Sequence, residues 1–339
     1  MVTSNWGFKM RKFLLFFMGF ILAVSTALMP GCSQDSHEVE VKPLRVGWFP
    51  WPGWYPIAIA KEKGFFDKHG VSVDPILYTT YTAIFSDFAA AKVDSVHGGL
   101  YELLKINVPG MKVVLATDYS EGGEGLVVTS DINSPADLAG KRLGIQGALS
   151  GSEFILTTLL RKHGLSRTDL TLVDVGPEIV LETMPEQIQG GYTWEPFLSK
   201  AKDKGYKVLF TTADTPGMIP DVIAFQGEVV KKRPADVQAF VDAWFEAQQY
   251  WLANREECDT IIARAIGMDA GDISLKGCRI LSRQDNLKAF AKESQPSSLF
   301  DVGAMQIDFF ISVGDASTAP NLEEILDPVF VKGDGDFQK

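Results

Sequence analysis

The sequence predicts an α/β protein that contains two successive βαβαβ units followed by helices. Short apolar runs alternate with segments of helical periodicity along most of the chain. The alternation occurs twice, at 44–128 and 129–220, and the residues up to 320 are mainly helical. The roughly three hundred residues after Cys32 are enough for two units that each have a core.

The first unit opens with the apolar run LRVGWF at 44–49, which is typical of a buried strand. A helical segment at 55–70 follows, and Gly64 is expected to end it. Further strands and helices are predicted at 71–77, 81–93, 94–99, 101–107, 111–118 and 125–130.

The second unit is predicted to begin with a short helix and a strand within 132–146. Its remaining elements are expected at 151–165, 170–175, 177–189, 190–194, 195–205 and 207–212. Pro185 must disturb the helix at 177–189, because proline lacks the backbone N–H that a helix interior needs. After this unit, 233–267 reads as long helix and 297–314 as a last helix.

The first 32 residues predict a secretory signal. A basic segment at 9–12 precedes an uncharged, mostly apolar run at 13–29, and Met10 could equally be the true start. The sequence LMPGC resembles a bacterial lipobox, which implies that Cys32 is diacylated and becomes the new N-terminus. A transmembrane anchor is the alternative, but the apolar run is short, and the polar segment at 33–43 fits a flexible tether. Residues 321–339 are expected to form a C-terminal tail.

The charge and the cysteines limit the classes of partner. A net charge of −11 at pH 7 repels nucleic acid, so a nucleic-acid partner is not expected. Cys258 and Cys278 would lie in a compartment that permits disulfides. They could form a disulfide or remain two buried thiols, because the pairing geometry cannot be read from a sequence.

The chain lacks the motifs of common enzymes. The stretch after the first strand is GWFPWPG, where a dinucleotide-binding protein needs G-x-G-x-x-G. The sequence has no G-x-S-x-G, no H-E-x-x-H and no Cys/His cluster, and its four histidines are scattered. Only His97, at a strand end, could contact a ligand, and a structural role is favoured for it. We therefore expect no catalytic activity, no cofactor and no metal.

Four stretches carry a family resemblance. The segment LRVGWFPWPGWYPIAIAKEKGFFDKHGVSVD resembles the opening of bacterial solute-binding proteins of the nitrate, sulfonate and taurine type, a group that includes binders of thiamine pyrimidine precursors. AIFSDFAAAKVDSVHGG, SPADLAGKRLGIQGALSGSEFILTTLLRKHGL and GGYTWEPFLSKAKDKG resemble later parts of the same proteins, so the likeness covers 44–315. The pyrimidine-synthesising relatives of this fold have a cysteine-rich iron motif that is missing here.

The resemblance implies a two-lobed periplasmic binding protein (type II) with the ligand cleft between its lobes. Lobe 1 would comprise 44–128 and 222–320, and lobe 2 would comprise 129–221. Such a monomer would capture a small solute of the sulfonate, taurine or nitrate class by lobe closure and deliver it to an ABC permease in the inner membrane. It would lie in the periplasm or at the cell surface, anchored to the membrane through Cys32. Two alternatives are a sensor that presents its solute to a membrane receptor and a binder of a cationic heterocycle such as a thiamine precursor.

Three tryptophans lie at the carboxyl end of the first predicted strand and in the turn after it. Ligands of open α/β sheets lie beyond the carboxyl ends of strands, which is where Trp48, Trp51 and Trp54 should be. The prolines among them stiffen the turn and would present the rings pre-organised. We therefore expect these rings to line the pocket, although any one of them could instead pack against the following helix.

Further ligand-binding candidates lie at other strand ends. They are Thr80, Tyr81, Thr82, Gly99, Ser150, Ser152, Trp194 and Glu195. The loop at 146–152 could bind an oxyanion through backbone N–H groups and its serines, or a serine could simply cap the next helix. Glu195 could equally be a first-turn acid that the helix dipole favours.

Acidic residues at the expected crossover between the lobes bear on the charge of the ligand. The stretch TDYSEGGEG places Asp118, Glu121 and Glu124 there, and Asp118 is a candidate ligand contact. An acid in the cleft disfavours nitrate or a bare sulfonate and favours a ligand that carries an amine. Aromatic rings, acids and a helix start together suit a zwitterion such as taurine or a cationic heterocycle.

Overall fold

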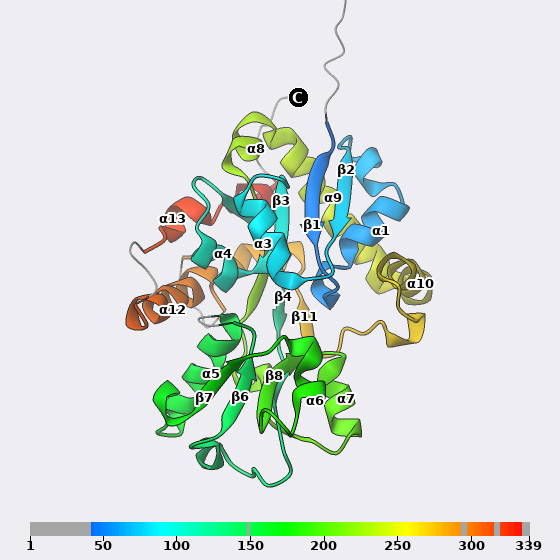
Figure 1. The fold of residues 1–339 in the computed structure, drawn as a ribbon. Helices are drawn as coiled ribbons and strands as arrows, with labels where there is room; N and C mark the ends of the chain where they lie inside the picture. The colour runs from blue at the N-terminus through cyan, green and yellow to red at the C-terminus, as the bar shows by residue number, and fades with distance from the viewer. Residues whose placement is uncertain (1–41, 148–149, 293–296, 315–318, 334–339) are drawn as a thin grey trace, which may run out of the picture. The chain divides into compact units, whose positions relative to one another are not determined.

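The computed structural model of the chain describes residues 42–147, 150–292, 297–314 and 319–333. The expected signal segment with Cys32, and the chain from 334 onward, lie outside these residues. The described residues form a two-lobed α/β fold with two separate sheets flanked by helices (Figure 1). None of the helices among them is long and apolar enough to cross a membrane.

The sheet of the first lobe has six strands in the order β11-β4-β10-β3-β1-β2. Their bounds are β1 (Leu44–Trp48), β2 (Val73–Leu77), β3 (Ser95–Gly99), β4 (Lys112–Ser120), β10 (Pro220–Phe225) and β11 (Cys278–Ile280). β1 pairs in parallel with β2 and β3, whereas β10 runs antiparallel between β3 and β4. A strand that follows the second lobe in sequence therefore lies inside the first sheet.

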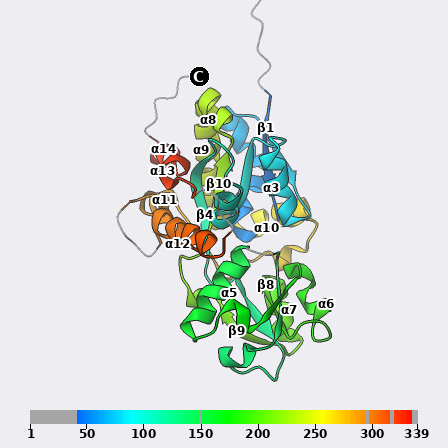
Figure 2. The same ribbon diagram turned by 60° about the vertical axis from the view of Figure 1, so that its left-hand side comes forward.

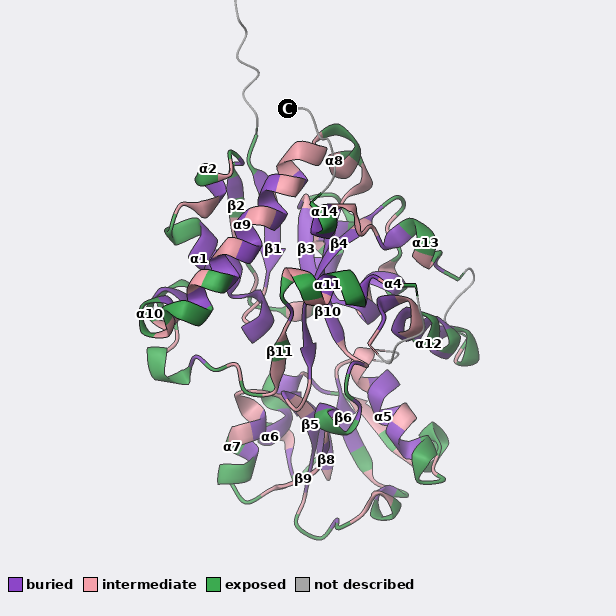
Figure 3. Cartoon of the chain, turned by 180° about the vertical axis from the view of Figure 1, so that it is seen from behind, coloured by how far each residue is buried: buried purple, intermediate pink, exposed green. Residues whose placement is uncertain are grey.

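Helices cover this sheet on both faces, so every residue of β3 and β10 is buried (Figure 3). The helices are α1 (Pro56–Glu62), α2 (Phe65–Lys68), α3 (Tyr81–Ala89), α4 (Leu100–Ile106), α8 (Gly227–Lys232), α9 (Pro234–Ala253), α10 (Arg255–Ile266), α11 (Arg283–Ala289), α12 (Leu299–Ser312), α13 (Leu322–Ile325) and α14 (Val329–Lys332). Along α9 the buried residues Val237, Phe240, Val241 and Trp244 recur at helical spacing, which gives the helix one apolar face toward the core.

The sheet of the second lobe has five strands in the order β7-β6-β8-β5-β9. Their bounds are β5 (Glu124–Val128), β6 (Arg142–Ile145), β7 (Thr171–Asp174), β8 (Gly190–Trp194) and β9 (Lys207–Thr211). Three helices belong to this lobe, namely α5 (Gly151–Lys162), α6 (Val180–Thr183) and α7 (Phe197–Asp203), and Figure 2 shows α5 beside the sheet.

Glycine, asparagine and proline positions limit the predicted helices. As expected, the helix in 55–70 ends at Gly64, whose φ of 70° is left-handed, so that α1 precedes it and the short α2 follows. The segment at 233–267 is split into α9 and α10 at Asn254. Within 177–189 only a 3₁₀ turn and α6 are helical, and the helix ends before Pro185, as the missing N–H of proline requires.

The lobe limits differ from those expected. The strand β5 pairs with β8 and β9, so residues 124–128 belong to the second sheet and not to lobe 1. Part of the expected tail is also ordered structure, because α13 and α14 lie within 321–333. Phe330 and Val331 are buried there, and Leu326 forms a bridge with Val113 of β4.

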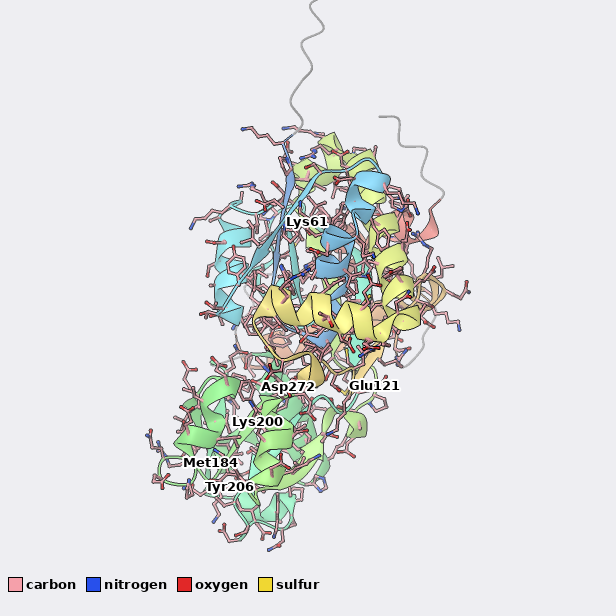
Figure 4. All side chains as sticks on the ribbon, turned by 90° about the vertical axis from the view of Figure 1, so that its right-hand side faces the viewer. Lys61, Glu121, Met184, Lys200, Tyr206 and Asp272 are labelled. Atoms are coloured by element: carbon pink, nitrogen blue, oxygen red, sulfur yellow. The ribbon has the colours of Figure 1, made fainter. Side chains whose placement is uncertain are left out.

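The chain passes between the lobes at 121–123 and returns at 212–219. Beside the first crossing, the carbonyl of Gly277 accepts hydrogen bonds from the N–H of Glu121 at 2.8 Å and of Gly123 at 2.9 Å. Figure 4 labels Glu121 at this crossing. A third contact comes from Lys276, whose ammonium lies 3.3 Å from Glu195 of the second lobe.

Candidate functional site

A cavity between the lobes is lined by residues from strand ends and helices of both lobes. The first lobe contributes Phe49, Trp51, Trp54, Tyr81, Gly99, Leu100, Tyr101, Glu102, Asp221 and Gln306. The second lobe and the returning segment contribute Glu124, Gln146, Gly151, Ser152, Phe154, Tyr192, Trp194, Met218, Ile219 and Pro220. The cavity measures about 60 Å³. Because a single water needs roughly 10–15 Å³ on this scale, the space suits a small solute.

Aromatic rings form much of the wall. Trp54 and Tyr81 stack with ring centroids 6.0 Å apart and planes 21° apart. From the second lobe, Trp194 meets Tyr81 edge-on with centroids 5.9 Å apart. Phe49 contacts the same tyrosine edge-on at 5.8 Å. Tyr81 is thus the centre of an aromatic cluster that draws on both lobes, and such clusters bind apolar surface and cations through the ring faces.

The three tryptophans that the sequence predicted in the pocket do not all lie there. Trp51 and Trp54 line the cavity, as do the predicted Tyr81, Gly99 and Trp194. Trp48 does not, because it is the last residue of β1 and is buried in the core with an exposed fraction of 3%. For this ring the packing alternative fits, and its expected place in the lining is wrong.

Three carboxyl groups face the cavity, from Glu102, Glu124 and Asp221, and the described lining contains no lysine or arginine. Glu124 begins β5 and accepts a hydrogen bond from the hydroxyl of Tyr192 on the neighbouring β8 at 2.8 Å. Asp221 lies in β10 opposite Gly99 of β3. An anion would find no opposite charge among these side chains, whereas a cation would find several.

Burial makes these carboxyl groups reluctant to ionise. Desolvation raises the pKa of Glu124 to about 7, against the hydrogen bonds from Tyr192 and Ser120 that favour the carboxylate. Burial also raises the pKa of Glu102. The pKa of Asp221 lies well above its usual range because of burial and then because of the charge on Asp118. A bound cation would compensate these charges in place of water.

Asp118 lies behind the lining and not in it. It is fully buried in β4, opposite Asp221 of β10, and the two carboxyl groups share a hydrogen bond. Its Oδ2 accepts from the indole N–H of Trp51 at 3.0 Å and from the thiol of Cys278 at 2.8 Å, and its Oδ1 accepts from Thr117 at 2.7 Å. The expected direct contact of Asp118 with a ligand is therefore wrong in this structure, because other protein groups occupy its oxygens.

The two serines at the start of α5 have different roles, one as a helix cap and one in the cavity wall. Ser150 is the N-cap of α5, and its hydroxyl accepts the N–H of Glu153 at 3.4 Å, whereas Ser152 lines the cavity. Thr80 and Thr82 are exposed and outside the lining, although Thr82 borders a neighbouring surface hollow. Their expected place in the site is not seen, since Thr80 is the N-cap residue of α3, Thr82 lies in its first turn, and both are exposed.

Glu195 has a structural role. Its carboxylate accepts the backbone N–H of Ser199 at 3.0 Å and its hydroxyl at 2.9 Å, so it holds the first turn of α7, and it does not line the cavity. His97 is also structural, because it is fully buried and its Nδ1–H donates to the carbonyl of Gly47 at 3.0 Å. Burial lowers the pKa of His97 to about 3, so the ring stays neutral.

The two cysteines are free thiols, so the disulfide alternative is wrong. Cys258 is buried within α10, while Cys278 begins β11 and donates to Asp118. Burial raises the pKa of both thiols. Cys278 thereby serves as a neutral hydrogen-bond donor behind the site.

Two polar atoms of the lining lack a partner among the described residues. They are the indole Nε1 of Trp54, a donor, and Oε1 of Gln306, an acceptor, and each side chain is 2% exposed. Buried polar groups are normally hydrogen-bonded, so no described residue supplies the usual partner of these two atoms. The sequence offered no signal for Gln306, which lies in the middle of α12.

Comparisons with known proteins identify the family of the chain. Residues 37–267 match the model of the NMT1-like family. The chain belongs to the NMT1-like family. It is 27% identical over 246 residues to the taurine-binding periplasmic protein of Escherichia coli (strain K12), an alignment that covers 68% of this chain and 76% of the relative. The chain therefore has a periplasmic, solute-binding relative.

Solved structures show the same fold. The alkanesulfonate-binding protein SsuA from Xanthomonas axonopodis pv. citri, bound to MOPS, superposes with a TM-score of 0.68 at 16% identity over 84% of this chain and 98% of that one. The desulfurization enzyme DszB also superposes, with a TM-score of 0.62 at 18% identity over 86% and 98% of the two chains. The periplasmic binding protein fold is thus shared by binding proteins and by an enzyme. The fold alone does not tell these two classes apart, so the residues of the site must be used.

Proposed function

We propose that this NMT1-like protein is the extracytoplasmic solute-binding component of an ABC importer and captures a small, positively charged organic solute between its lobes. The observation that carries this proposal is the composition of the cavity wall. Three carboxyl groups and several aromatic rings line it, and the described lining has no basic side chain. The fold and the taurine-binding relative support the binding role. The charge of the lining limits the solute to positively charged compounds.

Charge balance favours a cation over the nitrate and sulfonate expected from the family. After the larger effect of burial, repulsion from Glu102 raises the pKa of Glu124, and repulsion from both of these acids raises the pKa of Asp221. A cation among them would relieve this repulsion, whereas an anion would add to it. Each aromatic ring face that the cation meets contributes about 0.5–2 kcal/mol, and more as water is excluded.

The solute should also carry groups that match the unpartnered atoms of the wall. An acceptor on the solute would satisfy Nε1 of Trp54, and an N–H or O–H donor would satisfy Oε1 of Gln306. An amine-bearing heterocycle has this combination, because its ring nitrogen accepts and its amine donates. A bare inorganic cation lacks it. Within the described residues no group of three His, Cys, Asp or Glu side chains is arranged to hold a metal ion.

The remaining parts of the proposal concern location and partners. The protein would act as a monomer in the periplasm or at the cell surface, anchored to the membrane through Cys32. Lobe closure would bury the solute, and a permease in the inner membrane would receive it from the closed form. The periplasmic relative supports this location.

Native mass spectrometry of residues 33–339, purified gently from cells, is the first test. We expect an added mass that disappears on denaturation and belongs to a cationic compound. A thermal-shift panel then compares amines, aminopyrimidines, taurine, an alkanesulfonate, nitrate and Ca²⁺. Stabilisation by amines or aminopyrimidines alone supports the proposal. Stabilisation by nitrate or the alkanesulfonate, with none from the cations, would overturn the charge assignment.

A further inference from the structure

The carboxylate of Glu102 crosses from the first lobe to the helix start of the second. Glu102 lies in the first turn of α4, and its Oε1 accepts the backbone N–H of Gly151 at 3.2 Å. Gly151 is the first residue of the 12-residue α5, where free N–H groups and the helix dipole favour a negative charge. This is the loop where the sequence predicted an oxyanion of the solute. In the structure, a carboxylate of the protein occupies that position.

Two glycines leave room for this carboxylate, one on each lobe. A Cβ atom at Gly99 would lie 2.4 Å from Oε2 of Glu102, and a Cβ at Gly151 would lie 2.9 Å from Oε1. The hydroxyl of Tyr81 hydrogen-bonds the same carboxylate, and Lys105 on the next turn of α4 lies close enough to favour its charge. A larger residue at either glycine would displace the carboxylate.

Aromatic packing beside Glu102 joins the same two elements. Phe154 of α5 stacks on Tyr101 of α4, with ring centroids 5.8 Å apart and planes 26° apart. It also meets Phe309 of α12 edge-on at 5.5 Å. The start of α5 is therefore held against the first lobe by apolar contacts, and the polar contact at Glu102 lies at the cavity end of this interface.

We propose that Glu102 is a specificity-determining residue that acts as an internal substitute for the anionic group of a solute. Its carboxylate takes the helix-start N–H that a sulfonate or carboxylate of a ligand would need, and its charge repels such a group. The site thereby rejects anions while retaining an acceptor for a cation. The inference rests on the proposed binding site but not on which cation fills it.

The test uses three probes with the same two-carbon skeleton, namely ethanesulfonate, taurine and 1,2-diaminoethane. Their affinities for residues 33–339 are measured by calorimetry with wild type, Glu102→Ala and Glu102→Gln. We expect Glu102→Ala to bind ethanesulfonate and taurine at least about tenfold more tightly than wild type does, a change of about 1.4 kcal/mol. Glu102→Gln should gain less, because its amide oxygen can still accept the N–H of Gly151.

Glu186→Ala is the matched control, since Glu186 is an exposed acid of the second lobe and its loss changes the net charge equally. It should bind all three probes as wild type does. A folded Glu102→Ala protein that gains nothing for ethanesulfonate overturns the inference, and so does an equal gain in Glu186→Ala. Gly151→Ala offers a second variant, because its Cβ displaces the carboxylate without removing its charge, and weaker anion rejection is expected there too. If Glu102→Ala gains anion binding while wild type binds no cation, the inference stands and the proposed function fails.

Discussion

The indole N–H of Trp51 donates a hydrogen bond to Oδ2 of Asp118 across 3.0 Å, which ties the wall of the cavity to a fully buried carboxyl group behind it. The same oxygen accepts the thiol of Cys278. Asp118 therefore orients an aromatic ring of the site, and its effect on a solute passes through that ring and through its partner Asp221.

We expect Asp118→Asn to act on stability more than on binding. The asparagine amide would present an N–H₂ group to donors that now share a carboxylate, so unfolding free energy should fall by about 1–3 kcal/mol. Urea unfolding followed by tryptophan fluorescence measures this change. Solute affinity should fall less than it does in Glu124→Gln. Loss of binding in Asp118→Asn without loss of stability would contradict this role.

Glu124→Gln should weaken the binding of a cationic solute, because Glu124 is one of the carboxyl groups that line the cavity. The pKa of about 7 means that the carboxylate forms on going from acid to alkaline pH. Wild-type affinity should therefore rise with pH, and the variant should lose about tenfold at pH 8 but less at about pH 5.5.

Calorimetry with a quaternary ammonium probe makes this measurement, since the charge of that probe does not change with pH. Glu121→Gln is a suitable control, because Glu121 pairs with Arg279 at 2.7 Å outside the lining. An equal loss of affinity at both pH values would show that the charge of Glu124 is not what binds the cation.

Trp54→Phe separates the ring from its N–H group. The ring contributes to the aromatic wall, whereas Nε1 is buried and has no partner among the described residues. We expect the ligand-free variant to keep its stability to within about 1 kcal/mol, because no protein hydrogen bond is lost. Affinity should fall for a solute that has a hydrogen-bond acceptor for Nε1 and stay unchanged for a matched solute that lacks it. Calorimetry with two such solutes measures the difference.

Local patterns predicted the elements near the site better than the side chains that meet there. The run LRVGWF and the proline-rich turn after it placed Trp51 and Trp54 at a strand end, and the structure puts both in the cavity wall. The rule that ligands lie beyond the carboxyl ends of strands depends only on where a strand ends, and it needs no knowledge of the rest of the fold. The rule does not apply to Trp48, because Trp48 is still within β1 and its ring packs in the core.

Residues whose position depends on distant pairing were missed. Asp221 enters the site because β10 returns from the second lobe and inserts between β3 and β4, and nothing near residue 221 signals these neighbours. Glu102 looks like an ordinary first-turn acid, and its contact with Gly151 exists only once the lobes meet. Glu124 was recognised in the sequence as an acid at the expected crossover between the lobes. Its hydrogen-bond partner Tyr192, however, is 68 residues away in sequence.

The stability of the ligand-free protein should fall as the pH rises. The folded-state pKa of Glu124 is raised from 4.5 to about 7, so the folded state holds this proton more tightly than the unfolded chain does. Its contribution is fully present below about pH 4.5 and is lost as the pH rises through about 7, a change on the order of 3 kcal/mol. The raised pKa values of Glu102 and Asp221 act in the same direction.

Chemical unfolding at about pH 5.5 and about pH 8 tests this dependence, and both values bracket the expected transition. Glu124→Gln has no such proton to lose, so it should be more stable than wild type at the higher pH and similar to it at the lower. A wild-type protein that becomes more stable over the same range would contradict the burial of these carboxyl groups.

Tyr192→Phe should move the pH dependence of binding upward. The hydroxyl of Tyr192 donates to Oε2 of Glu124 at 2.8 Å, and this bond favours the charged form of the carboxyl group. Without it, the pKa of Glu124 should rise further above its usual value, and the midpoint of cation binding should rise with it. Affinity at high pH should change little, because the carboxylate still forms there. Tyr206→Phe is the matched control, since Tyr206 donates to the carbonyl of Met184, away from the lining. If the midpoint stays the same in Tyr192→Phe, then Glu124 is not the group whose ionisation governs binding.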